Sequence, residues 1–202
     1  MTALKKMILF FLFMGISYSS HAMDIIKLLS KCDNSFFKQI NQNKQFTMIP
    51  DAISPSELFS DNGISIPLQH TTEEGIEIDH FIAIAIDLDR YKTIPSDNIN
   101  GKFYFWGFET SQAELDVIQR ISTKLPLIEG GGYYVANSMM RNTNEDPWQH
   151  NLAPVSGIAP TGNSAEKLFF IEANKENGTV KLMCTLQGNV NDEDLKAIGL
   201  IH

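Results

Sequence analysis

The amino-acid sequence predicts a single α+β domain, with a mainly antiparallel sheet and helices packed on one face. Aromatic and aliphatic strand-like runs outnumber strand–helix–strand units, and no linker or internal repeat divides the chain. Asn177 and Gly178 form a hairpin turn signal near the C-terminus. A length of 202 residues suffices to bury most of the surface of one domain. We therefore expect residues 23–202 to form one domain that ends in a β-hairpin and a short terminal helix.

Helices are predicted by capping residues and by the spacing of apolar side chains. Caps begin a short helix at Ser54, another at Ser111 and a last short one at Asp192. The first predicted helix follows Asp24, and its apolar residues recur at intervals of three and four. These residues, which include a cysteine on the core side, are Ile25, Leu28, Leu29, Cys32, Phe36 and Ile40.

Strands are predicted where apolar residues alternate along the chain. In the clearest strand, 76–88, the isoleucines and His80 share one face, while Phe81 shares the other face with two alanines and several acids. Because the middle of both faces is apolar, we expect it to be covered on both sides. The remaining predicted strands are an aromatic strand at 103–108, a strand at 133–140, and the hairpin strands 168–173 and 179–186.

Residues 1–22 are predicted to be a secretory signal peptide. Two lysines precede the uncharged apolar run 7–16, and Ser20 and Ala22 supply the small residues expected before a cut at Met23. Since a membrane span needs about 20 apolar residues, the run is too short to remain as an anchor. The alternative is an N-terminal core helix. The signal predicts a soluble protein of the periplasm, or a secreted one, that is released by cleavage between Ala22 and Met23.

The two cysteines, Cys32 and Cys184, are predicted to form a disulfide bond. In an oxidising compartment two cysteines near opposite ends of a chain are more often paired than free. In the chain-entropy model, a bridge that closes so long a loop contributes up to about 5 kcal/mol of stability. The alternative is two separate buried thiols. Neither cysteine has a second cysteine or a histidine at metal-ligand spacing.

The charge balance restricts the class of partner. The formal charge is −8 and the isoelectric point is about 5.0, and loss of the signal lysines makes the mature chain more acidic. An acidic surface repels nucleic acid and anionic lipid. We therefore expect no nucleic-acid binding and no stable membrane insertion after cleavage.

No catalytic or metal-binding pattern stands out, so the sequence predicts no cofactor, no metal site and no catalytic residue. The histidines beyond the signal segment lack the i, i+4 spacing of paired metal ligands. The glycines at 130–132 precede a predicted strand, whereas a phosphate-binding loop precedes a helix. The chain is thus more typical of a binding protein than of an enzyme.

The irregular segment 142–165 is the strongest candidate for a functional surface. Loops of this length are uncommon in compact domains and often carry function. Trp148 lies there among charged residues, and tryptophan and arginine supply much of the binding energy at interfaces. The alternative is that Trp148 folds back onto the sheet. The predicted partner-binding residues are Arg141, Asp146, Trp148 and His150, extended by Tyr133 and Tyr134 on the preceding strand.

Together these features favour an exported, non-enzymatic binding protein. It would present the 142–165 loop and the neighbouring sheet surface to a protein partner in the cell envelope, for example a toxin or lytic enzyme that it neutralises. One alternative is an envelope hydrolase or metal-dependent enzyme with His150 as general base. The other is a small-ligand carrier, which requires an apolar pocket behind the aromatic strand.

Overall fold

The structure is a computed structural model that describes residues 24–43, 62–72, 75–88, 101–154 and 163–200, together with residues 46, 48, 49, 53, 58 and 60. The predicted signal peptide lies outside these residues, and so does nearly all of the short helix predicted from Ser54. The fold and the site below are built from the described residues alone.

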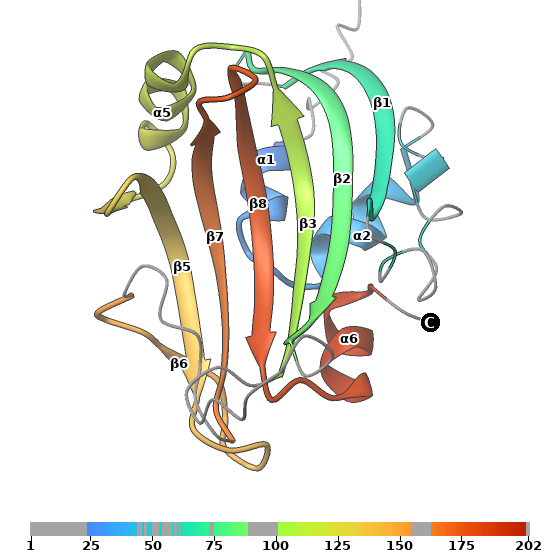
Figure 1. Cartoon of the computed structure of the whole chain (residues 1–202), viewed down its shortest axis with the longest axis vertical. Helices are drawn as coiled ribbons and strands as arrows, with labels where there is room; N and C mark the ends of the chain where they lie inside the picture. Colours follow the sequence, from blue (N-terminus) through green and yellow to red (C-terminus); the bar gives the residue numbers. More distant parts are fainter. Residues whose placement is uncertain are drawn as a thin grey trace, which may run out of the picture.

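The described strands form one open antiparallel sheet (Figure 1). Its order is β1-β2-β3-β8-β7-β5-β4, and the short strand β6 pairs with β5. The predicted α+β class with a mainly antiparallel sheet is therefore confirmed, as is the C-terminal hairpin of β7 and β8. The strands are β1 (Ile64–Thr71), β2 (Glu77–Asp87), β3 (Lys102–Thr110), β4 (Ile128–Gly130), β5 (Tyr133–Arg141), β6 (Gln149–His150), β7 (Ala165–Asn174) and β8 (Thr179–Gly188).

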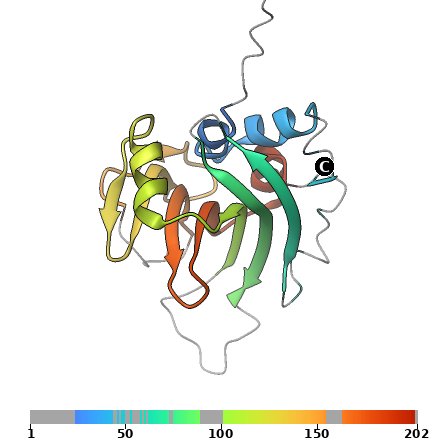
Figure 2. The same cartoon turned by 90° about the horizontal axis from the view of Figure 1, so that it is seen from above.

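Four helices are short and accompany the sheet. Figure 2 shows α1, α2 and α6 on the same side of the sheet, with α5 beside the end that holds β5 and β7. Contacts between helix and sheet side chains, given below, attach α1, α2 and α6 to that side. The helices are α1 (Ile25–Leu29), α2 (Asn34–Ile40), α5 (Glu114–Ser122) and α6 (Asp192–Ile198).

The helix predicted from Asp24 is broken into two. Asp24 caps α1 as expected, because its side chain accepts a hydrogen bond from the Lys27 amide. The chain then turns at Cys32, whose φ of 49° is left-handed, and Asp33 caps α2. The alternation of apolar residues survived this break because α1 and α2 bury side chains in the same core cluster.

Two predicted caps are displaced. The capping box of Ser111 and Glu114 is wrong, because α5 begins at Glu114 after Ala113, which makes no side-chain cap hydrogen bond. The Ser111 amide instead donates to Asp79 on β2. At the last helix the cap is Asn191, one residue before the predicted Asp192, and Asn191 forms a capping box with an aspartate of the first turn.

One face of the sheet packs against α1, α2 and α6, and we call it the helix-covered face. Phe36 of α2 lies 6.4 Å from the Phe81 ring of β2 and 5.6 Å from the Phe108 ring of β3, measured between ring centroids. These three side chains are fully buried. Ala83 and Ala85 lie on the same face, and their small side chains leave room for the helices to approach.

The predicted disulfide bond between Cys32 and Cys184 is present. It joins the turn between α1 and α2 to the middle of β8, with the two Cα atoms 5.5 Å apart, and closes a sequence separation of 152 residues. Both cysteines are buried in the core. The bond therefore fastens the first helices to the helix-covered face.

The opposite face, here called the isoleucine face, carries the other side-chain set of the same strands. Direct pairing places Ile84 beside Phe105, and Phe105 beside Thr185 of β8. Gly107 lies in this row because a Cβ atom there would come within 2.1 Å of the Leu182 carbonyl oxygen. The face consists of Ile82, Ile84, Ile86, Phe103, Phe105, Gly107, Leu168, Phe170, Met183 and Thr185.

Candidate binding site

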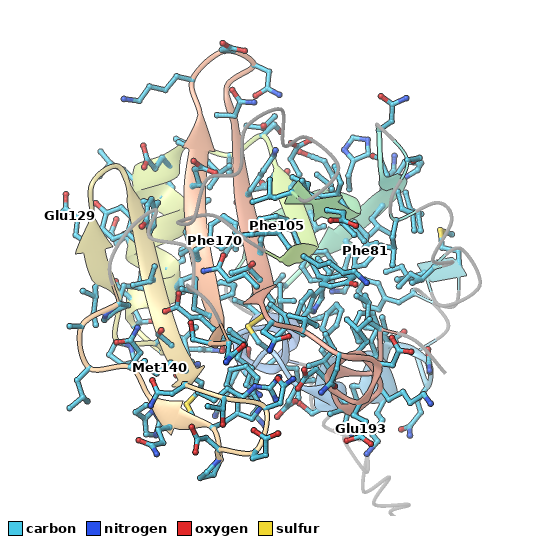
Figure 3. All side chains as sticks on the ribbon, turned by 60° about the horizontal axis from the view of Figure 1, so that its bottom comes forward. Phe81, Phe105, Glu129, Met140, Phe170 and Glu193 are labelled. Atoms are coloured by element: carbon cyan, nitrogen blue, oxygen red, sulfur yellow. A yellow bond between two sulfur atoms is a disulfide. The ribbon has the colours of Figure 1, made fainter. Side chains whose placement is uncertain are left out.

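The isoleucine face presents a strip of aromatic side chains. The Phe105 ring lies 6.4 Å from Phe103 and 6.2 Å from Phe170 between centroids, and the second pair meets edge to face. Figure 3 shows Phe105 and Phe170 close together over the centre of the sheet. All three rings stay partly exposed, and so do the isoleucines of β2. Packed rings on a rigid sheet form a surface that needs little ordering to bind a partner.

A buried hydroxyl lies at the centre of this face. Thr185 is paired with Phe105 on one side and Leu168 on the other. It is 3% exposed, and its Oγ1 atom has no hydrogen-bond partner. An unsatisfied buried hydroxyl costs about 1–3 kcal/mol of stability. The isoleucine face thus keeps a polar group that apolar packing alone does not require.

A cleft of about 730 Å³ lies at the end of this face where β1, β2 and β3 meet the β7–β8 turn. The bulge of β1 between Pro67 and His70 shapes one wall. The cleft therefore has an apolar wall and a polar floor. Its lining residues are Pro67, Leu68, Gln69, Asp79, His80, Glu109, Ser111 and Thr179.

The polar groups of the cleft are joined in pairs. Glu109 Oε2 accepts a hydrogen bond of 3.0 Å from the Thr179 hydroxyl, and Glu109 Oε1 lies 3.8 Å from His80 Nδ1. Asp79 Oδ2 accepts a 2.6 Å hydrogen bond from the Ser111 amide. His80 and Glu109 meet because antiparallel pairing places them directly opposite each other. This register brings a histidine, two carboxylates and two hydroxyl-bearing residues into one cleft.

The other end of the isoleucine face holds a buried carboxylate. Glu166 is 6% exposed and accepts hydrogen bonds from Ser138 Oγ at 2.9 Å, Asn151 Nδ2 at 2.8 Å and Gln187 Nε2 at 2.9 Å. Three donors satisfy most of the hydrogen-bonding capacity of a carboxylate. Glu166 therefore holds β5, β7, β8 and the segment after β6 together.

Arg141, a predicted contact residue, is buried in a structural ion pair. Its guanidinium donates to both oxygens of Asp194 at 2.7 and 2.6 Å, and the two side chains are 5% and 8% exposed. It also donates to the Asn144 side chain and the Asn189 carbonyl. Asp194 belongs to the capping box of α6. Arg141 thus links the end of β5 to the start of α6.

Trp148 packs back against the core, as in the alternative weighed from the sequence. The Arg141 guanidinium and the Lys167 ammonium each lie 4.9 Å from its ring. Burial lowers the pKa of Lys167 and nearby Arg141 lowers it further, while Asp33 and Asp194 act in the opposite direction. Cations over an indole ring stabilise its position, so the structure gives Trp148 a supporting role in the hairpin of β5 and β6.

The other predicted contact residues lie apart. His150 is exposed on β6 opposite Met139, and Asp146 accepts a hydrogen bond from the Thr143 amide in the turn before β6. Tyr133 and Tyr134 begin β5, where Tyr134 packs on the core cluster. The structure therefore does not gather the predicted residues into one surface.

Sequence reasoning missed the cleft, although it had noted His80 as a sheet-end histidine. The carboxylate that reaches a histidine is Glu109, and the pair forms only through the register of β2 and β3. A usable signal was the equal distance of both residues from the apolar centres of their strands. Within the described residues, no group of three or more His, Cys, Asp and Glu side chains could hold a metal ion.

Comparison of the chain with protein-family models, with curated proteins and with solved structures gave no match. No helix of the described part of the chain is long and apolar enough to cross a membrane. The function is therefore argued from the site.

Proposed function

We propose that this chain is an exported binding protein that engages a protein partner of the cell envelope through the isoleucine face. In this proposal all the helices gather on the opposite side and hold the fold. The observation that supports it best is the partly exposed strip of Phe103, Phe105 and Phe170. Soluble monomers rarely expose contiguous apolar patches, and such patches mark interaction surfaces.

The acidic character of the chain suits a basic partner. Opposite charge accelerates association and selects partners, whereas apolar contact supplies most of the affinity. The predicted loop residues take a different part in the proposal. Arg141 and Trp148 support the sheet, since both are packed or paired within the fold.

Export is part of the proposal. A buried disulfide and the absence of a membrane-spanning helix from the described residues are compatible with a soluble protein in an oxidising compartment. Mass spectrometry of protein purified from the periplasm is expected to give a mature N-terminus at Met23. A chain that keeps residues 1–22 and stays in the cytosol contradicts this part of the proposal.

Site-specific photo-cross-linking in exporting bacterial cells tests the binding face. A photoreactive phenylalanine analogue replaces Phe105 or Phe170, and Leu115 of α5, which is 78% exposed, serves as the control position. We expect a discrete adduct from positions 105 and 170 and none from position 115. Equal adduct patterns at all positions, or turnover of an envelope substrate by the purified protein, contradict the proposal.

A further inference from the structure

We propose that the cleft beside the isoleucine face receives an arginine or lysine side chain of the protein partner. This inference rests on the proposed function and names the chemistry by which the partner is recognised. The partner segment would be extended, with a basic side chain in the cleft and apolar side chains over the isoleucine face.

The charges of the cleft favour a cation. Asp79 and Glu109 supply carboxylates, and none of its described lining residues is a lysine or an arginine. One oxygen of each carboxylate is used by the Ser111 amide or the Thr179 hydroxyl, which fixes the side chain in place. The second oxygen of each retains acceptor capacity. Two fixed carboxylates match the planar fork of donors on a guanidinium.

The walls of the cleft suit the rest of a basic side chain. Pro67 and Leu68 line the side formed by the bulged strand β1. Arginine and lysine bury their aliphatic stems along apolar surface while the charged group reaches polar partners. The cleft volume of about 730 Å³ accommodates such a side chain together with adjoining backbone.

The cleft is continuous with the isoleucine face. Ile82 follows His80 by two residues on the same face of β2, a separation of about 7 Å along a strand. In an extended partner the side chains at positions i and i+2 have the same spacing. A basic side chain in the cleft therefore places the next apolar side chain of the partner over Ile82, with the Phe105 ring beyond it.

A second, independent observation points to an occupant. Thr185 lies on the isoleucine face, is 3% exposed and has a hydroxyl without a hydrogen-bond partner. Buried hydroxyls are normally paired. A backbone or side-chain group of a segment lying along this face would supply the missing partner.

An NMR titration of the mature, disulfide-bonded protein tests the inference. The probe is the capped peptide Phe-Ala-Arg-Ala-Phe, and its control carries citrulline, which keeps the shape of arginine without the charge. We expect the amides of His80, Ile82 and Glu109 to shift with the arginine peptide. The citrulline peptide is expected to bind about tenfold more weakly, because a charge-assisted hydrogen bond is lost.

Matched variants locate the effect. Glu109→Gln keeps an acceptor for Thr179 but removes the charge, and we expect about tenfold weaker binding of the arginine peptide. Asp79→Asn is a second cleft variant with the same expectation. Glu172→Gln, an exposed position of β7 that does not line the cleft, is expected to leave binding unchanged.

Several results overturn the inference: no binding of the arginine peptide, equal binding of both peptides, or equal losses from Glu172→Gln and Glu109→Gln. Arginine amide that binds as tightly as the peptide also overturns it, because the cleft then serves a small ligand. The adducts from positions 105 and 170 do not depend on the cleft, so these failures are distinguishable from failure of the proposed function.

Discussion

The two faces of the sheet use the same strands for different ends. On the helix-covered face Phe81 and Trp106 are fully buried and meet phenylalanines from α2. On the isoleucine face Phe105 and Phe170 meet each other and remain partly exposed. The comparison teaches that apolar content does not decide which face is covered. Ala83 and Ala85 lie on the covered side of β2, where their size admits the helices, and the bulkier isoleucines lie on the other.

The largest expected effect contrasts the two faces directly. Phe36→Ala removes a fully buried ring and is expected to lower the free energy of unfolding by about 3–5 kcal/mol. Phe105→Ala removes a partly exposed ring and is expected to cost about 1 kcal/mol. Urea unfolding of both variants with the disulfide intact measures the difference. Equal losses would mean that the isoleucine face is as much a part of the core as the other.

The ion pair at α6 gives a similar effect outside the aromatic core. Arg141→Met leaves the buried Asp194 carboxylate without its cation, which is expected to cost about 3–5 kcal/mol. Lys167→Met is the control, since Lys167 also lies over Trp148 but its loss leaves no printed ion pair broken; about 1 kcal/mol is expected. Thermal or urea unfolding compares them. If the two variants lose the same stability, the pair does not link β5 to α6 as described.

The disulfide is expected to have a slightly smaller effect. Replacing both Cys32 and Cys184 by alanine is expected to lower the free energy of unfolding by about 2–5 kcal/mol, because the open chain regains conformational freedom. Urea unfolding of this variant and of the reduced wild-type protein measures the loss. A protein that is equally stable with and without the bond would show that the first helices need no covalent attachment to β8.

The smallest expected effect has the opposite sign. Thr185→Val removes a buried hydroxyl that has no hydrogen-bond partner and is expected to raise the free energy of unfolding by about 1 kcal/mol. Thr110→Val is the matched control, because the Thr110 hydroxyl accepts a hydrogen bond from the Gln112 amide and its loss is destabilising. Destabilisation by Thr185→Val in urea unfolding would show that its hydroxyl is satisfied in the folded protein.

Local sequence signals predicted the elements better than their assembly. The turn at Asn177 and Gly178, the alternation of β2 and the pairing of Cys32 with Cys184 all appear as expected. The break at Cys32 was missed because the apolar spacing continues across it, and only its left-handed φ reveals the turn.

The site was less predictable because it depends on contacts between distant residues. Residues 142–154 read as an exposed loop, yet Arg141 finds its partner Asp194 in the last helix. The cleft requires the register of β2 against β3, which brings His80 to Glu109. Residue composition carries no information about strand register, so neither contact could be predicted from spacing.

The most direct test of a division between the two faces is the yield of the position-170 cross-link in a Phe105→Ala background. The account predicts that the adduct falls sharply although the variant remains folded, because Phe105 and Phe170 form one contact surface. An adduct of undiminished yield in the folded variant would contradict the assignment of the isoleucine face to partner binding.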